Sequence, residues 1–115
     1  MPKKYCLAID LQEDPALMEE YKRYHRDVWP EVKQSLGDSG ILAMEIYLVL
    51  NRLFMMIETK DDFSFEAKAA ADLANPKVQE WEALMGRLQK PLPNSDPNKD
   101  WKWQLAERVF EYKSS

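Results

Sequence analysis

The only histidine of this 115-residue chain, His25, lies four residues after Tyr21 and four before Trp29, in the stretch EEYKRYHRDVWPEV. Residues four apart are separated by about 40° around an α-helix, so the three rings would project from one face. An imidazole, with an ordinary pKa near 6.5, gives and takes protons near neutral pH. The pattern predicts a candidate general acid–base group among aromatic neighbours, although a lone histidine on such a face is more often a packed residue.

Other residues that could contribute chemistry give weaker signals. Trp81 and Trp103 are typical core residues, yet indole rings also form the apolar platforms on which the C–H faces of sugars stack. No two carboxylates have a spacing that indicates a two-carboxylate glycosidase site. The carboxylates considered on or near the predicted elements are Glu45, Glu58, Asp72 and Glu82.

The residue counts and the absent motifs exclude several classes of protein. Cys6 is the only cysteine, so an internal disulfide is impossible, and we expect a small buried side chain there. With one histidine and one cysteine, and with no calcium-loop pattern, we expect no metal site. The sequence contains no GxGxxG, P-loop, GxSxG or HExxH motif, which argues against nucleotide-dependent enzymes, serine hydrolases and zinc proteases.

The charge and hydropathy of the chain limit the classes of partner that it could bind. The 16 Lys and Arg residues against 20 Asp and Glu residues give a net charge of −4, and no basic run could neutralise a phosphate backbone, so nucleic acid is not an expected partner. No apolar stretch approaches the roughly 20 residues that span a bilayer, and no leader pattern opens the chain. We therefore expect a cytoplasmic protein without a membrane partner, folded as one domain over residues 1–115.

The first half of the chain predicts a strand, a broken helix and a hairpin. Residues Lys3–Leu11 alternate in the period of a half-buried strand, and Asp14 followed by Pro15 is a typical helix start. The helix should run from Pro15 to about Leu36 and should break near Asp27–Trp29, because Pro30 removes a backbone donor. After a turn at Gly37 and Gly40, two strands are expected, Ile41–Leu50 and Leu53–Thr59, joined by Asn51–Arg52.

The second half predicts a second broken helix and a last strand. An alanine-rich helix should cover Asp61–Ala74 and continue past Asn75–Pro76 to Gly86. The proline-rich run Gln89–Asp100 lacks any period and is expected to be an extended surface loop. The final strand is expected in the second half of WKWQLAERVFEYK, residues 101–113.

This order, βαββαβ, is that of the ferredoxin-like split βαβ fold, an α+β arrangement with an antiparallel sheet and both helical regions on one face. The four Trp and five Tyr residues of so short a chain would leave the other face of the sheet apolar and exposed. We therefore expect a homodimer in which two sheets pack face to face.

A longer pattern extends over nearly the whole chain in one order. It comprises E-Y-x-x-x-H-x-x-x-W-P-E at residues 20–31, IYL at 46–48, LFMMIE at 53–58, Trp81 in VQEWEALM, and RVF at 108–110. This pattern resembles the L-rhamnose mutarotase family. The resemblance implies a cofactor-free homodimer of the dimeric α/β-barrel type that interconverts the α and β anomers of a 6-deoxyhexose, an isomerase reaction on a monosaccharide.

The resemblance also assigns roles by matching position. His25 would be the catalytic general acid, Tyr21 would bind substrate, and Trp81 would form part of the wall that contacts the sugar. Trp29 matches the motif as a supporting residue that sets the helix against the sheet. The chain departs from the pattern at Met44, where a tyrosine is expected, and at Glu82, where a second tryptophan is expected.

These two departures bear on which sugar is accepted. Met44 lacks the hydroxyl of a tyrosine, and Glu82 replaces a flat apolar surface by a charged acceptor. Both side chains are still expected at the substrate, but with a different pattern of preferred hydroxyls. L-Fucose therefore becomes a candidate substrate beside L-rhamnose.

Mutarotation would require only proton transfer and positioning. His25 would protonate the ring oxygen, while a second group or a water would take the anomeric proton, and Tyr21 is expected in a hydrogen-bonding role. Two other classes stay open: a cofactor-independent monooxygenase of the dimeric α/β-barrel type, and a non-catalytic dimeric module that binds a small ligand. The loop Pro91–Pro97 could cover either the pocket or the partner subunit.

Overall fold

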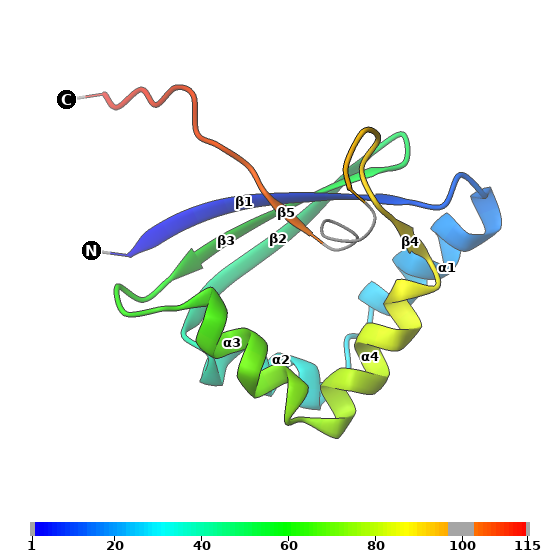
Figure 1. Ribbon diagram of the computed structural model, residues 1–115, viewed down its shortest axis with the longest axis horizontal. Helices are drawn as coiled ribbons and strands as arrows, with labels where there is room; N and C mark the ends of the chain where they lie inside the picture. The colour runs from blue at the N-terminus through cyan, green and yellow to red at the C-terminus, as the bar shows by residue number, and fades with distance from the viewer. Residues whose placement is uncertain (1, 97–102, 115) are drawn as a thin grey trace.

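A computed structural model describes residues 2–96 and 103–114 of the chain (Figure 1). Within these residues the chain alternates between strands and pairs of short helices. In chain order the elements are β1 (Lys3–Leu11), α1 (Pro15–His25), α2 (Pro30–Asp38), β2 (Ile41–Val49), β3 (Arg52–Thr59), α3 (Phe65–Leu73), α4 (Pro76–Gly86), β4 (Gln89–Lys90) and β5 (Gln104–Leu105).

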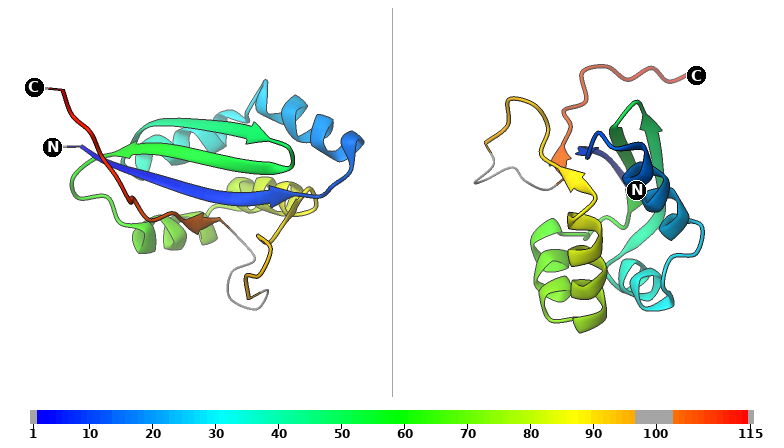
Figure 2. Two further views of the ribbon diagram at one scale, coloured as in Figure 1. Left: turned by 90° about the horizontal axis from the view of Figure 1, so that it is seen from above. Right: turned by 90° about the vertical axis from the view of Figure 1, so that its right-hand side faces the viewer.

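One antiparallel sheet carries the fold. Its strands lie in the order β2-β3-β1-β4, and β5 also pairs with β1, next to β4 on the same edge. The four helices lie on one face of this sheet and leave the other face open (Figures 1 and 2). This arrangement confirms the predicted α+β fold with an antiparallel sheet.

The strands place one set of alternating side chains under the helices. In β1 the buried apolar residues Leu7, Ile9 and Leu11 recur at every second position, and Ile9 pairs with Leu53 of β3. In β2 a register shift between Ile41 and Ala43 adds one residue, so Ile41 and Met44 both point to the helical side. The helix-covered face therefore becomes a continuous apolar surface.

The core forms where this apolar face meets the helices. Tyr21 on α1, Val32 on α2 and Trp81 on α4 pack against the sheet. The whole cluster of buried residues is Ile9, Leu11, Tyr21, Val32, Leu53, Trp81, Met85 and Leu88. Two of the predicted site residues, Tyr21 and Trp81, therefore also belong to the core.

The first helical region breaks where the sequence predicts. α1 ends at His25, α2 begins at Pro30, and Trp29 between them has the extended ψ of 137°. A residue before proline avoids the helical conformation, and proline itself is well tolerated at the first position of a new helix. The break therefore places His25 at the end of a helix rather than along its length.

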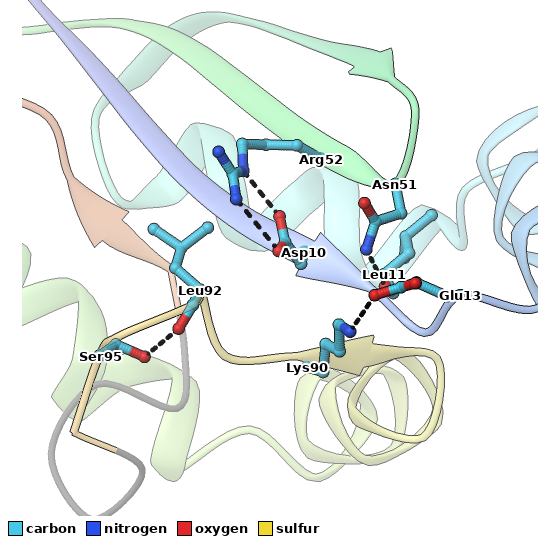
Figure 3. A network of polar contacts seen from close by, with 8 residues as sticks. All are labelled: Asp10, Leu11, Glu13, Asn51, Arg52, Lys90, Leu92 and Ser95. Carbon is cyan, nitrogen blue, oxygen red and sulfur yellow. Dashed lines mark hydrogen bonds and ion pairs between the residues drawn. The ribbon is translucent and has the colours of Figure 1, made fainter.

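Polar contacts fix the hairpin end of the sheet (Figure 3). The Arg52 side chain donates to both carboxylate oxygens of Asp10, at 2.8 and 3.3 Å, and the Asn51 side chain donates to the Leu11 carbonyl at 3.0 Å. Because Arg52 pairs with Asp10 it belongs to β3, and the turn is Leu50–Asn51 rather than the predicted Asn51–Arg52. Leu50 has a φ of 55°, in the left-handed region that non-glycine residues rarely adopt.

Two predictions at the C-terminal end need correction. The run from Gln89 is not wholly a loop, because Gln89 and Lys90 pair with Leu11 and Asp10 of β1 as strand β4. Lys90 also contacts Glu13 at 2.6 Å, which holds this short strand at the sheet edge (Figure 3). Residues 97–102, which include the end of that predicted loop and the start of the last segment, lie outside the described residues.

The predicted last strand is mostly absent from residues 103–114. Only Gln104–Leu105 pairs with β1, whereas residues 106–114 have no regular structure. This segment leaves the sheet on the side opposite the helices, and Val109, Phe110 and Tyr112 are largely exposed (Figure 1). An alternating pattern forms a strand only where a partner edge and a covering surface exist, and in the described chain the backbone pairing with β1 ends at Ala106, whose N–H donates to the Cys6 carbonyl at 2.7 Å.

The helices of the described residues are short. The longest, α1 and α4, have 11 residues each, whereas about 20 are needed to cross a bilayer. No helix among residues 2–96 and 103–114 could therefore span a membrane.

Candidate active site

A cavity of about 440 Å³ lies between the sheet and the four helices. Apolar side chains of the sheet form its floor, and residues of the helices, with Gln89 and Trp103, form its walls. The floor residues are Leu7, Ile41, Met44, Ile46, Met55 and Ile57. The cavity opens to solvent beside α3, where the lining residues Phe65 and Ala69 are exposed.

His25 lines this cavity as the last residue of α1. Its ring atom Nδ1 lies 2.9 Å from the backbone carbonyl oxygen of Tyr21, one turn earlier. A carbonyl oxygen only accepts hydrogen bonds, so Nδ1 must carry the hydrogen and donate it. The contact fixes the tautomer and leaves Nε2 as the nitrogen that can exchange a proton with a ligand.

Aromatic rings hold the imidazole in place. The Tyr21 ring stacks on His25, with centroids 4.1 Å apart and planes inclined by 27°. The Trp81 ring meets His25 edge-on at 5.4 Å, and Trp29 meets Trp81 in the same manner at 5.2 Å. Such pairs add to the packing energy and restrict the rotation of each ring. His25 is therefore both packed and in contact with the cavity.

Burial changes the protonation of both stacked groups. Desolvation lowers the pKa of His25 below its ordinary 6.5, and the hydrogen bond to the Tyr21 carbonyl opposes this only in part. Desolvation raises the pKa of the Tyr21 hydroxyl, and a hydrogen bond with the Gln89 side chain offsets a smaller part of that effect. At neutral pH the site therefore contains a neutral imidazole next to a protonated phenol.

The structure brings five of the six predicted site residues to one cavity. Tyr21 and His25 come from α1, Met44 from β2, and Trp81 and Glu82 from α4, and all of them line it. The sixth, Trp29, is not among the lining residues and packs behind Trp81, with the Lys77 ammonium 5.8 Å from its ring centre. Their roles in binding and catalysis are taken up below as proposals.

Four polar lining residues were not predicted as part of the site. Gln89 bonds Tyr21, but it was placed in a loop because its two-residue strand carries no periodic signal. Lys68 and Asp72 form an ion pair at 2.5 Å, and their i,i+4 spacing on a predicted helix could have indicated it. Ser35 donates to Asp72 from another helix, a tertiary contact that no local pattern reveals.

The described residues offer no cluster for a metal. Among residues 2–96 and 103–114, no three His, Cys, Asp or Glu side chains lie together in a way that could hold an ion. Cys6 is half-buried on the first strand and unpaired by any disulfide.

Comparisons with known proteins identify relatives over nearly the whole chain. The profile of the L-rhamnose mutarotase family matches residues 4–112. A protein named L-fucose mutarotase from Xanthomonas campestris pv. campestris is 44% identical over 110 residues, which cover 94% of this chain and 86% of the relative. A protein named L-rhamnose mutarotase from Phocaeicola vulgatus is 33% identical over 85 residues, 72% of this chain and 78% of that one.

Solved structures agree with the fold. The crystal structure of an L-rhamnose mutarotase from Formosa agariphila superposes with a TM-score of 0.70 at 22% identity and covers 96% of this chain and 99% of that one. Tetracenomycin F2 cyclase from Streptomyces glaucescens, a polyketide cyclase, gives a TM-score of 0.62 at 16% identity over 98% and 99% of the two chains. At these identities the two structures bear on the fold alone.

Proposed function

Because the chain belongs to the L-rhamnose mutarotase family, we propose that it interconverts the α and β anomers of a 6-deoxyhexose in the cavity above the sheet, with His25 as the proton-transfer group. The observation that carries this proposal is the geometry of His25. Its Nδ1 is committed to the Tyr21 carbonyl, its pKa is lowered, and its ring lines a cavity.

Ring opening requires two proton movements. Since burial favours the neutral imidazole, Nε2 of His25 first accepts the proton of the anomeric hydroxyl, while a water donates a proton to the ring oxygen. The bond between C1 and the ring oxygen breaks, and C1 becomes an aldehyde. His25 thus begins as a base, rather than as the acid that the family resemblance suggests for this step.

Ring closure reverses these transfers on the other face of the carbonyl. Rotation about the C1–C2 bond presents that face to the hydroxyl on C5, which attacks C1 and returns its proton to the solvent-derived base. The imidazolium of His25 then protonates the carbonyl oxygen and so acts as a general acid, although on a different oxygen from the ring oxygen that the family resemblance suggests. No atom is gained or lost, and the imidazole returns to its neutral state.

The other lining residues would bind the sugar. Tyr21 stays protonated because burial raises its pKa, so it acts as a hydrogen-bond donor rather than as a base. Trp81 forms an apolar wall beside the imidazole, and Glu82 accepts hydrogen bonds from sugar hydroxyls. Met44 lies on the apolar floor, where the C6 methyl group of a 6-deoxyhexose would lose no hydrogen bond.

The nature of the sugar follows from the relatives and the cavity. The 44% identical relative is named for L-fucose, which supports L-fucose as the preferred substrate over L-rhamnose. At about 30 Å³ for each water, the cavity has room for roughly fifteen waters, more than the eleven non-hydrogen atoms of either sugar. A free Cys6 and a monosaccharide substrate further support a cytoplasmic enzyme.

Exchange NMR tests this proposal directly. The rates of interconversion between the α and β anomers of L-fucose and of L-rhamnose are measured with the protein and in buffer alone. We expect faster exchange for both sugars, and a larger acceleration for L-fucose. Equal rates with and without protein for both sugars would overturn the proposed function.

We also propose that the protein is a homodimer through the open face of its sheet. Exposed apolar residues of β2 and β3 lie on this face, as do the cross-strand neighbours Tyr47 and Phe54. The described C-terminal segment on the same side exposes further apolar side chains. The exposed residues concerned are Leu42, Tyr47, Val49, Met56, Val109, Phe110 and Tyr112. Exposed apolar side chains gathered on one face in this way often mark an interface between proteins.

Sedimentation equilibrium of two matched variants tests the dimer. Val49→Asp introduces a charge into the open face, and we expect it to shift the mass from two chains to one. Leu73→Asp changes an equally apolar residue, 73% exposed on the helical side, and should leave the mass unchanged. A monomeric wild-type protein, or a dimer that Val49→Asp leaves intact, would contradict this arrangement.

A further inference from the structure

A second polar cluster lines the cavity at the ends of α2 and α3. The Lys68 ammonium lies 2.5 Å from one carboxylate oxygen of Asp72, and the Ser35 hydroxyl donates to the other at 3.2 Å. Asp72 is only 7% exposed, and the three residues all line the cavity. A buried ion pair is costly unless further hydrogen bonds complete it, so its position on a cavity wall calls for an explanation.

The cluster has unused hydrogen-bonding capacity. An ammonium has three donors, and Lys68 uses one of them for Asp72. The Ser35 hydroxyl donates to Asp72 and retains its acceptor lone pairs. Among residues 2–96 and 103–114, neither side chain makes a further hydrogen bond or ion pair. A sugar hydroxyl, which is both donor and acceptor, could accept from Lys68 and donate to Ser35 at once.

A bridge joins this cluster to the residues around His25. The Gln79 side-chain nitrogen donates to the backbone carbonyl of Asp72 at 2.8 Å and to the Glu82 carboxylate at 3.2 Å. Glu82 follows Trp81, whose ring touches His25. Gln79, which is not among the lining residues, therefore ties Asp72 to Glu82, and both of these residues line the cavity.

We propose that Ser35, Lys68 and Asp72 form the subsite that binds the C4 hydroxyl of the sugar. The proposal rests on the proposed function, because it takes the anomeric carbon to lie at His25. C4 is opposite C1 across a pyranose ring, and α3, which carries Lys68 and Asp72, lies toward the other end of the sheet from α1, which carries His25 (Figure 1). L-Fucose carries this hydroxyl axial and L-rhamnose carries it equatorial, and the two sugars also differ at C2, so the cluster would contribute to which of the two is preferred.

The competing role for the cluster is purely structural. Ser35 lies on α2, and Lys68 and Asp72 lie on α3, so their contacts could serve only to join the two helices. A structural role predicts that variants lose stability without changing the relative rates of two sugars. A subsite predicts a changed preference, since a site built to bond a hydroxyl rejects the analogue that lacks it.

The test compares L-fucose with 4-deoxy-L-fucose in the full-length protein. For the wild type we expect kcat/KM for anomer exchange to be at least about tenfold higher with L-fucose. Lys68→Met/Asp72→Leu removes both charges and so leaves neither unpaired. In this variant kcat/KM for the two sugars should differ by less than about twofold. Lys22→Met removes an ammonium from an exposed helical pair and should preserve the wild-type ratio.

Ser35→Ala keeps the test valid if the double variant does not fold. It removes one hydroxyl and no charge. We expect it to reduce the ratio of kcat/KM for L-fucose to that for 4-deoxy-L-fucose severalfold, at an almost unchanged melting temperature. The proposed subsite would be overturned if the wild type had equal kcat/KM for L-fucose and 4-deoxy-L-fucose. It would also be overturned if both variants kept the wild-type ratio of these two values.

Saturation-transfer NMR separates this inference from the proposed function. It measures binding of the two sugars whether or not exchange is accelerated. If the protein accelerates no exchange, the proposed function fails, and tighter binding of L-fucose that Ser35→Ala abolishes would still support the subsite. Acceleration without any preference for the C4 hydroxyl would leave the proposed function standing and would end this inference.

Discussion

The two ends of the cavity solve different physical problems. At one end the imidazole of His25 is enclosed by Tyr21 and Trp81, and desolvation keeps it neutral. At the other end Lys68 and Asp72 form an ion pair to which Ser35 adds a hydrogen bond. The aromatic end is suited to moving a proton, because its base is neutral near pH 7. The charged end is suited to recognition, because it offers directional donors and acceptors.

The largest expected effect separates the two ends by kinetics. His25→Ala should lower anomer exchange of L-fucose by about 10² to 10⁴, the usual contribution of general acid–base catalysis. Lys68→Met/Asp72→Leu should act mainly on the preference between sugars. Exchange NMR on both variants measures this, with circular dichroism to verify folding. Full activity in His25→Ala would contradict the assignment of proton transfer to the aromatic end of the cavity.

The next effect concerns stability at the aromatic end. Trp81 is 8% exposed and packs against the rings of Tyr24, His25 and Trp29, so Trp81→Ala should reduce the free energy of unfolding by about 3–5 kcal/mol. Urea denaturation measures the change. Leu73→Ala, at a residue 73% exposed, serves as the control and should cost less than about 0.5 kcal/mol. A Trp81→Ala cost as small as the control would mean that this wall is not packed.

The pH dependence of activity sharpens the role of His25. Since the neutral imidazole begins the cycle, kcat/KM should be constant above pH 6.5 and should fall as acid protonates His25 around its lowered pKa. Exchange rates across the acid range measure this profile. A rate that rises toward acid pH would instead indicate that the imidazolium begins the reaction, as the family resemblance suggests.

The smallest effect is on stability as a function of pH. Burial lowers the pKa of His25 in the folded chain below the 6.5 expected in the unfolded chain, so the unfolded chain binds the proton more readily. The contribution of His25 to the free energy of unfolding is therefore full above pH 6.5 and is lost as the pH falls through the lowered pKa. Urea midpoints of the wild type and His25→Gln should converge in this window, and parallel curves would contradict the shift.

The sequence predicted the features that local patterns encode. Alternation identified the strands β1, β2 and β3, and Pro30 and Pro76 located the breaks in both helical regions. The family, the α+β fold and the class of enzyme, an isomerase acting on sugar anomers, are confirmed by the comparisons and the structure. Tyr21 and His25 are neighbours as predicted, because one helix turn separates them, whereas Trp29 lies beyond the end of α1.

The sequence missed features that depend on contacts between distant segments. β4 has two residues and exists because its edge pairs with β1, so no period marks it. Ser35 joins the charged cluster from another helix, 37 residues away from Asp72 in the chain. The alternation in residues 107–113 predicted a strand that the structure does not contain. An alternating pattern indicates which face of a strand could be buried, but it does not show that another segment covers that face.

The end of α1 at His25 has a consequence for how this scaffold could change. The imidazole lies on the last residue of α1, and Arg26 to Trp29 form the link that connects α1 to α2. Lengthening that link by one residue would leave the ring stacked on Tyr21 within α1, but it would shift the position at which Trp29 and α2 meet Trp81. The support around the imidazole could therefore change without altering the helix that carries it.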